Sequence, residues 1–269
     1  MKILKILFIS FVLFLMYFPL LLIALLSFNN DGTGTDFTGF TFKWYITLIN
    51  DSSLVKAIYN TFTIAFLSTI ISTILGTLSA IGINSLNRKA KKRMIFFNNV
   101  PILNADIVTG IFLLLIFSLI GQIIGIQYML GFTTVLIAHV LFSTPYVVLS
   151  VLPKLGEMDP NLYDAALDLG CRPTYALRKV IIPSIKSGIF SGMLLAFTMS
   201  IDDFVISYFV SGATMNNFSI WLYGNLKNTK NNTWPKAYAY NTSIVIITVI
   251  GILIYLYIKN RKKGSKKNA

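Results

Sequence analysis

The stretch Asp159–Pro183 reads DPNLYDAALDLGCRPTYALRKVIIP and is the longest charged segment between the apolar runs of this chain. Within it, apolar residues recur at the spacing of one helix face, and polar residues occupy the other side of the same turns. The apolar positions are Leu162, Ala165, Ala166 and Leu169, and the polar ones are Asn161, Asp164 and Asp168. The pattern predicts a short amphipathic helix.

Both ends of this helix are encoded in the sequence. Asp159 is a residue type that caps the first amides of a helix, and Gly170 is the type that adopts the left-handed closing conformation. A second short helix is expected from Pro173 until Pro183 interrupts or bends the chain. The apolar face of the first helix therefore needs a surface to pack against.

Composition predicts an integral membrane protein. The 269 residues are 55% hydrophobic, and the mean hydropathy is +0.71, well above that of a soluble domain. The net charge of +13 comes from short basic clusters beside apolar runs, which serve membrane topology rather than binding of nucleic acid. The single cysteine, Cys171, excludes an internal disulfide and lacks the partners of a thiolate metal site.

Six apolar runs are long enough to cross a bilayer as helices, which predicts an all-α membrane protein. The first run is longer than the apolar part of a signal peptide, so it is expected to be retained as a span. The fifth run is less uniform because it carries two aspartates. The six runs are Ile3–Phe28, Ala57–Asn84, Pro101–Ile120, Gly131–Leu152, Gly188–Val210 and Tyr240–Ile258.

Lysine and arginine residues are distributed unequally between the two sides of this six-span arrangement. Eighteen of the 23 lie on the side that holds both termini, so both termini are expected in the cytoplasm. The expected organisation is a first transmembrane helix (1–28), an extracytoplasmic loop (29–56), a core (57–258) containing the cytoplasmic loop 153–187, and a basic cytoplasmic tail (259–269). The protein is thus predicted to be a multi-pass protein of the cytoplasmic membrane, embedded in its lipid bilayer.

Motifs for nucleotide hydrolysis or enzymatic catalysis are missing from the sequence. There is no glycine-rich phosphate loop ending in Gly-Lys-Ser or Gly-Lys-Thr, so any ATP would be used by another protein. The one histidine, His139, lies mid-span without a second metal ligand nearby in sequence, which favours a hydrogen-bonded packing role. A membrane-bound enzyme is therefore disfavoured, and no metal or cofactor is expected on this chain.

Three carboxylates lie within the predicted spans: Asp106, Asp202 and Asp203. A carboxylate in the membrane interior costs about 2.5 to 3.5 kcal/mol on insertion scales, so each needs a partner, a water-filled cavity or a cationic ligand. Adjacent helical residues point about 100° apart, so at most one of Asp202 and Asp203 is expected to contact a ligand directly while the other pairs with a neighbouring helix. The alternative is that all three pair with basic residues at helix ends.

The depth of Asp106 depends on where its helix begins. If the span starts at Pro101, this carboxylate lies near the cytoplasmic end of the span. If the helix starts at Met94 and is kinked at Pro101, the carboxylate lies nearer the middle of the membrane.

The loop sequence resembles the coupling loop of permease subunits of binding-protein-dependent ABC importers. The matching residues are Tyr163–Ala166, then Leu169 and Gly170, then Ile181–Pro183, with Asp164 in place of the usual Glu and Ile182 in place of the usual Leu. The resemblance implies a type I ABC importer permease fold whose cytoplasmic coupling helix docks in a groove of a separate ATPase. The residues assigned to this coupling are Leu162, Asp164, Ala165, Ala166, Leu169 and Gly170.

The motif around the membrane aspartates is more specific and resembles spermidine/putrescine permeases of the PotC type. It consists of Asp106–Val108 and Ser200–Ser207, although Ala105 stands where proline is expected. The resemblance implies a second permease subunit of the companion type, a cytoplasmic ATPase dimer that uses ATP, and an extracytoplasmic polyamine-binding protein. It also implies transport by alternating access, with Asp106, Asp202 and Asp203 forming a pathway for cationic polyamines.

Two alternatives to a polyamine ABC permease stay open at this point. The cargo of an ABC permease could be another small solute, although an anion carrier should place Lys or Arg in the spans. A self-contained secondary transporter would use the same intramembrane carboxylates for proton coupling. Only the ABC permease would bind an ATPase through the 153–187 loop.

Overall fold

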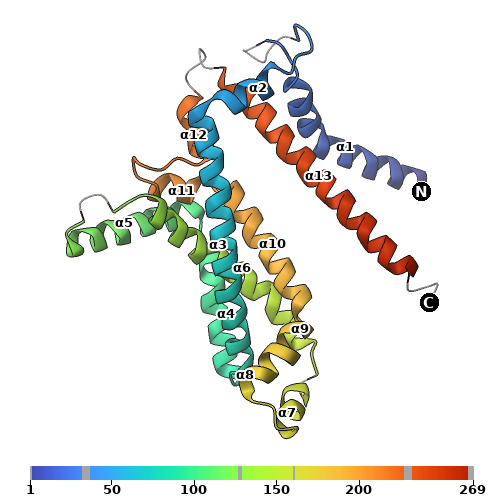
Figure 1. Cartoon of the computed structure of the whole chain (residues 1–269), viewed down its shortest axis with the longest axis vertical. Coiled ribbons are helices and arrows are strands. Elements are labelled where there is room, and N and C mark those ends of the chain that lie inside the picture. Colours follow the sequence, from blue (N-terminus) through green and yellow to red (C-terminus); the bar gives the residue numbers. More distant parts are fainter. Residues whose placement is uncertain (1, 32–36, 127–128, 160, 227–231, 266–269) are drawn as a thin grey trace. The chain divides into compact units, whose positions relative to one another are not determined.

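The computed structural model describes residues 2–31, 37–126, 129–159, 161–226 and 232–265 (Figure 1). Within these ranges the regular secondary structure is helical, and no β-strand forms. The β-type pairing found there is an isolated bridge between Asn29 and Phe40. The all-helical class predicted from the apolar runs is therefore correct. The chain divides into two compact units, Met1–Val55 with Trp221–Ala269, and Lys56–Ile220.

In the first unit, helices α1 (Lys2–Leu26) and α2 (Lys43–Asn50) both pack against α13 (Thr233–Ser265). The segment 29–56 was expected as a loop, but it contains α2 and the first residues of α3, which begins at Ser52. The indole of Trp44 is buried and donates a hydrogen bond to the carbonyl oxygen of Asn29. This contact connects α2 to the segment that follows α1.

The second unit contains all or part of each of the remaining helices. Its long helices are α3 (Ser52–Ser85), α4 (Arg88–Leu103), α5 (Asp106–Ile124), α6 (Phe132–Gly156) and α10 (Lys186–Asp202). Its short helices are α7 (Asn161–Asp168), α8 (Pro173–Ala176), the π-helix η1 (Leu177–Ile181), α9 (Ile182–Ser184), α11 (Val205–Val210) and α12 (Phe218–Asn225). Helices α3 and α12 each run across the boundary between the two units.

Glycines allow the helices of the second unit to approach closely. A Cβ atom added to Gly192 of α10 would lie 3.1 Å from the Cα atom of Val147 in α6. A Cβ atom added to Gly76 of α3 would lie 2.6 Å from the Cβ atom of the same valine. Small residues at such positions permit the close backbone contacts typical of membrane helix bundles.

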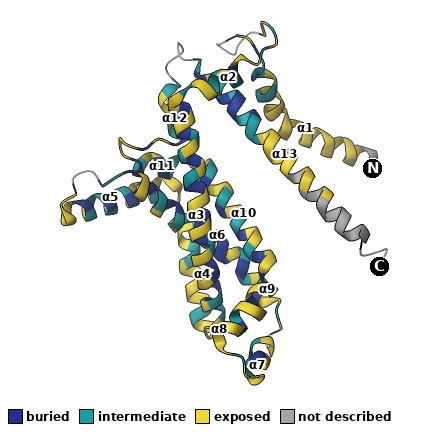
Figure 2. Cartoon of the chain, viewed as in Figure 1, coloured by how far each residue is buried: buried dark blue, intermediate teal, exposed yellow. Residues whose placement is uncertain are grey.

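Among the described residues, four helical segments are long and apolar enough to cross a membrane, or five if the bent pair Pro173–Ser184 and Lys186–Asp202 forms one span. The four are Leu4–Leu26, Ser52–Ser85, Asp106–Ile124 and Phe132–Gly156, so the protein is a multi-pass membrane protein. Figure 2 shows exposed residues along nearly the whole of α1, whose large apolar side chains lack cover. The predicted last span, 240–258, falls within α13, and several of its side chains lie outside the described ones.

Two of the predicted spans differ from the observed helices. The run Gly188–Val210 is broken after Asp202, because Asp203 has an extended backbone with φ −66° and ψ 125°. The run Pro101–Ile120 is broken at Asn104 and Ala105, so Pro101 belongs to α4 and a new helix begins at Asp106. Each break therefore lies beside a predicted site carboxylate.

Candidate functional site

Asp203 shapes the break between α10 and α11. Its Oδ1 atom accepts a hydrogen bond from the amide of Ile206 at 3.2 Å, and its Oδ2 atom accepts one from the amide of Ser207 at 2.8 Å. These are amides of the first turn of α11, which have no partner within the helix. The Asp203 carboxylate therefore caps α11, and its side chain is only 8% exposed.

His139 of α6 connects this cap to the neighbouring helices. Its Nε2 atom lies 2.9 Å from the hydroxyl of Ser207 and 3.4 Å from Oδ2 of Asp203, and its Nδ1 atom lies 2.6 Å from the hydroxyl of Ser200. The Ser200 hydroxyl also lies 3.0 Å from that of Ser68 in α3. Because a carboxylate only accepts hydrogen bonds, an attractive contact with Asp203 requires the proton on Nε2 of His139.

The buried network thus consists of Ser68, His139, Ser200, Asp203 and Ser207, from four helices and the break between two of them. Its polar groups satisfy one another, as buried groups must to avoid the cost of desolvation. The packing role predicted for His139 agrees with these contacts. The sequence reasoning missed the pairing with Asp203, although the flanking serines at 200 and 207 were a signal for it.

Asp202 differs sharply from the residue that follows it. It is the last residue of α10, its side chain is exposed, and within the described residues its carboxylate forms no hydrogen bond or ion pair. Membrane carboxylates normally have a partner or line a hydrated cavity. Of the two consecutive aspartates, Asp203 is the one that pairs with a neighbouring helix, and Asp202 is free to meet a ligand.

Asp106 lies at the other break, in the first turn of α5. Its side chain is exposed, and in the described part of the chain it likewise has no hydrogen bond or ion pair. The 16 residues of α4 rise about 24 Å from the basic start at Arg88, and the 17 of α10 rise about 26 Å from Lys186. The two breaks therefore lie at similar distances from the basic residues at which α4 and α10 begin. Asp106, which follows α4, is thus far from the basic start of that helix.

Helices α5 and α11, which follow the two breaks, pack against each other. A Cβ atom added to Gly110 of α5 would lie 2.8 Å from the ring of Phe209 and 3.5 Å from the Cα atom of Ile206. Farther along, Gly121 of α5 lines the same cavity as Gly212, which follows α11. The two helices thus run in the same direction, and their first residues, next to the three aspartates, lie at the same end of the pair.

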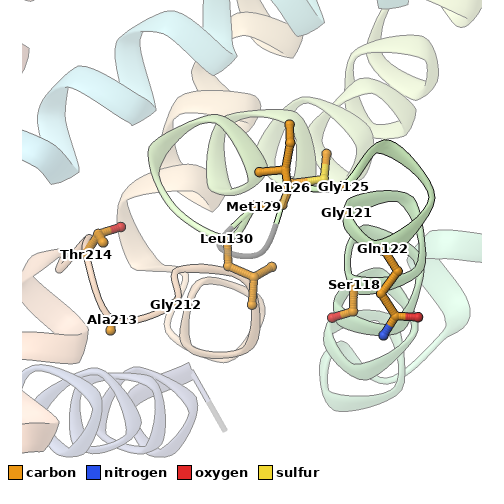
Figure 3. Close-up of a pocket in the computed structure, with 10 residues that line it drawn as sticks. All are labelled: Ser118, Gly121, Gln122, Gly125, Ile126, Met129, Leu130, Gly212, Ala213 and Thr214. Atoms are coloured by element: carbon orange, nitrogen blue, oxygen red, sulfur yellow. The ribbon is translucent and has the colours of Figure 1, made fainter.

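The cavity shown in Figure 3 lies at the opposite ends of these helices and has a volume of about 660 Å³. The side chains of Ser118 and Gln122 lie on successive turns of α5, and Leu130, Gly212 and the segment to Thr214 form other parts of the wall. None of the predicted site residues lines it. Its polar groups are neutral hydroxyls and an amide, so it offers no charge for recognising a cation.

The predicted amphipathic helix forms as α7, with both expected ends. The Oδ1 atom of Asp159 accepts a hydrogen bond from the amide of Asn161 at 2.9 Å. Gly170 has φ +82°, and the amide of Cys171 donates to the carbonyl oxygen of Ala166 at 3.1 Å, the pattern of a Schellman closure. The expected second helix also begins at Pro173, and the chain bends by 72° after Ser184.

The apolar face of α7 is divided between the interior and the surface. Leu169 is 85% exposed, and Leu162 and Ala165 are also exposed. Ala166 is buried within the chain, and Tyr163 packs against the core beneath α7. One helical turn places Ala166 with Tyr163 on the inner face of α7, and the part of Ala166 in ATPase coupling stays a prediction. Asp164 and Gly170 are exposed as well.

No group of three or more His, Cys, Asp or Glu residues that could hold a metal ion is found in the described ranges. Cys171 is a free, half-buried cysteine. The arrangement instead offers two unpaired carboxylates beside helix breaks and one exposed apolar helix face at the end of a bent segment. The first feature can attract a cation, and the second can dock on a protein.

Comparisons with known proteins relate the chain to transport systems. Residues 72–264 match the family described as binding-protein-dependent transport system inner membrane component. The chain is 31% identical over 259 residues to the spermidine/putrescine transport system permease protein PotC of Escherichia coli (strain K12), covering 96% of this chain and 95% of that protein. It is also 31% identical over 250 residues to the putrescine transport system permease protein PotI of the same strain, covering 92% of this chain and 88% of PotI.

Solved structures show the same fold at lower sequence identity. A bacterial ABC transporter involved in the import of the acidic polysaccharide alginate matches with a TM-score of 0.73 at 13% identity, covering 96% of this chain and 95% of that chain. An amino acid ABC transporter with histidines matches with a TM-score of 0.55 at 19% identity, covering 80% of this chain and 98% of that chain. At these identities the likeness concerns the fold alone.

Proposed function

Because the chain belongs to the family of binding-protein-dependent transport system inner membrane components, we propose that it is the permease subunit of an ABC importer for polyamines. Spermidine and putrescine occur in the names of relatives that are 31% identical over most of the chain. The observation that carries the proposal is the presence of two unpaired carboxylates, Asp106 and Asp202, beside helix breaks. A polyamine carries two or more ammonium groups, which carboxylates attract more strongly in a low-dielectric environment than in water.

The roles of the three aspartates are not the same in this proposal. Asp202 and Asp106 would line the cation pathway, since neither is engaged elsewhere in the described part of the chain. Asp203 would hold the break that presents Asp202, because its oxygens are used by two backbone amides and it lies against His139. The permease would thus offer a weak transit site, while a binding protein would supply most of the selection among cations.

The proposed topology has six spans and cytoplasmic termini. Five spans correspond to the long apolar helices and the bent pair, and the sixth would be formed by α13 around residues 240–258. The excess of Lys and Arg on one side supports this orientation. In it, the start of α4 and the α7–α9 segment lie at the cytoplasmic face, and α2 lies outside.

Energy would come from a cytoplasmic ATPase dimer, since the sequence has no phosphate-binding loop of its own. The exposed residues Leu162, Ala165 and Leu169 would dock in a groove of that ATPase, with Asp164 facing polar or basic groups at its rim. A companion permease and an extracytoplasmic polyamine-binding protein would complete the complex. The chain itself would bind neither ATP nor a metal.

Alternating access would be transmitted by rigid connections within the second unit. The segment from α7 to α9 is joined to α10 through the 72° bend, and α10 ends at the pair of aspartates. Movement of α7 with the ATPase would therefore tilt α10 and change the position of Asp202. Inward and outward states would differ in which side of the membrane reaches this carboxylate.

The proposal is tested by reconstituting the chain in liposomes with its companion permease, ATPase and binding protein. Uptake of labelled spermidine and putrescine should require ATP and should fall when Asp202 or Asp106 is replaced by Asn. Glu157→Gln is the matched control, because Glu157 is exposed and pairs only with Lys154 three residues before it. ATP-driven uptake of an amino acid or a sugar, with polyamines neither transported nor competing, would overturn the proposed cargo. Uptake driven by a proton gradient without the ATPase would overturn the proposed mechanism.

A further inference from the structure

A second cavity lies between the ends of α3 and α6 and the α7–η1 segment, with a volume of about 710 Å³. Most of its wall is apolar, formed by Ile81, Leu155, Met158, Tyr163, Leu177 and Ile181. The volume falls within the range of about 300 to 1,000 Å³ that is usual for ligand pockets. None of the proposed cation-pathway residues takes part in it.

A basic cluster borders this cavity. Five of the six residues in Arg88–Arg93 are Lys or Arg, and the first of them begins α4. The Nζ atom of Lys91 donates a hydrogen bond of 2.7 Å to Oδ1 of Asn84, and Asn84 lines the cavity. The ammonium group of Lys91 therefore lies at the rim. Arg88 lies one helical turn before Lys91, and it lines a separate hollow with Lys89 and Arg93.

The cluster has no acidic partner within the described ranges of the chain. None of the ion pairs formed by the described residues includes a member of Arg88–Arg93. Glu157, which stands between two residues of the cavity wall, is already paired with Lys154 at 2.6 Å. The positive charge at the rim is therefore available to an external anion.

The surface of α4 changes from basic to apolar immediately after the cluster. Phe96 and Phe97 are 65% and 66% exposed and face outward from the helix bundle. Such a change along a surface helix marks the boundary between lipid headgroups and acyl chains. The basic rim and the apolar cavity thus lie at the depth in the membrane where the phosphate headgroup of a phospholipid meets its acyl chains.

We propose that this cavity binds an anionic phospholipid, with the phosphate against Lys91 and Arg88 and an acyl chain within the apolar wall. Charge complementarity favours an anionic over a zwitterionic lipid. Tyr163 of the wall belongs to α7, so the acyl chain packs against the inner side of the segment proposed to dock on the ATPase. The lipid would support the position of α7 whatever the transported cargo is.

Native mass spectrometry of the full chain in mild detergent tests the site. Phosphatidylglycerol should bind in preference to phosphatidylcholine with the same acyl chains, and glycerol phosphate, which lacks acyl chains, should not bind. The double variant Arg88→Gln with Lys91→Gln should weaken phosphatidylglycerol binding about 30-fold, or about five-fold per charge, which corresponds to about 1 kcal/mol for each basic residue at a membrane surface. Lys56→Gln, an exposed lysine elsewhere on the chain, should leave binding unchanged.

A cavity-filling variant tests the acyl-chain part separately. A Cβ atom on Gly156, which lines the cavity, would meet nothing within 4 Å, so Gly156→Leu should enter the open space and reduce phosphatidylglycerol binding at least five-fold. Gly251→Leu, an equally open helical position in α13, is its control. Equal binding of the two lipids, or binding that neither variant changes, would overturn the proposal. Binding of glycerol phosphate alone would also overturn it, and unchanged polyamine uptake would not.

Discussion

The Nε2 atom of His139 lies 3.4 Å from Oδ2 of Asp203, although the two residues belong to different helices. The same carboxylate caps α11 through the amides of Ile206 and Ser207. One side chain therefore both ends α10 with a defined break and connects that break to α6. The neighbouring carboxylate of Asp202 has no such task.

Substitution of Asp203 should affect the stability of the protein, whereas substitution of Asp202 should affect polyamine binding. Asp203→Ala removes the cap and should lower the free energy of unfolding by about 1 to 2 kcal/mol, whereas Asp202→Ala should leave it unchanged. Asp202→Asn should instead weaken polyamine affinity about ten-fold, or about 1.4 kcal/mol. Thermal unfolding in detergent and uptake by proteoliposomes measure the two effects. A loss of stability for Asp202→Ala equal to that for Asp203→Ala would contradict this division.

His139 should be a structural residue rather than a proton carrier. His139→Leu leaves the hydroxyls of Ser200 and Ser207 without their imidazole partner and should destabilise the protein by about 1 to 3 kcal/mol. His139→Gln, which retains a donor and an acceptor, should lose less. Unfolding midpoints of both variants, measured beside polyamine uptake, test this prediction. A Gln variant as stable as the native protein but without pH-dependent uptake would point to proton transfer instead.

The sequence predicted the helical elements better than their interruptions. Periodicity and cap residues located α7, its end at Gly170 and the restart at Pro173, because these depend on neighbours within the same few residues. Hydropathy could not locate the break after Asp202, since Val205–Val210 is apolar enough to continue a span. That break depends on backbone amides captured by Asp203 and on a histidine from another helix. The contact with a histidine 64 residues away in sequence cannot be read from the residues next to Asp203.

The sequence also could not show which apolar residues of α7 are exposed. The spacing of Leu162, Ala165, Ala166 and Leu169 correctly indicated one apolar side of a helix. It could not show that Ala166, on the flank of that side, is buried and that the adjacent Tyr163 packs against the core. A wide apolar stripe on a short helix can serve two surfaces at once, and only the packing distinguishes them.

Asp51 and Lys236 should give the first unit a dependence on acidic pH. Burial raises the pKa of Asp51, but hydrogen bonds from Lys236 at 2.7 Å, from Ser53 and from the Leu54 amide outweigh it and lower this pKa to about 2. The pKa of Asp51 in the folded protein is below its ordinary value of 3.8. The ion pair therefore stabilises the fold fully above pH 3.8, and this stabilisation is lost as the pH falls toward about 2.

The expected size of this contribution is about 1 to 2 kcal/mol, because the pair is partly exposed and solvent screens its attraction. Asp51→Asn should therefore lower stability at neutral pH and should flatten the decline between pH 4 and 2. Thermal unfolding across that range measures both effects, with Asp159→Asn as a control carboxylate that has no ion pair among the described residues. An unchanged decline in the Asp51→Asn protein would rule out this ion pair as its source.

Gly170 should tolerate only residues that accept a left-handed backbone. At φ +82° a β-branched side chain is strained, so Gly170→Val should displace the end of α7 and reduce ATP-driven uptake more than ten-fold. Gly170→Asn should retain much of the activity because asparagine adopts this conformation more readily. Gly251→Val in α13 is the control, since no positive φ is required there and a Cβ atom would meet nothing within 4 Å. Membrane insertion, measured by the amount of folded protein in the membrane fraction, should be the same for all three variants.

The exposed and buried parts of α7 provide a final test of coupling. Leu169 is 85% exposed, so Leu169→Glu should leave the stability of the chain unchanged but weaken its association with the ATPase at least ten-fold, because a charge would replace an apolar contact. Ala166→Glu places a charge in the interior and should instead reduce the amount of folded protein. Copurification of the ATPase and thermal unfolding distinguish the two effects. If Leu169→Glu copurifies a full complement of ATPase, then α7 does not dock through its exposed apolar face, and the stretch from Asp159 to Pro183 must act through its polar side.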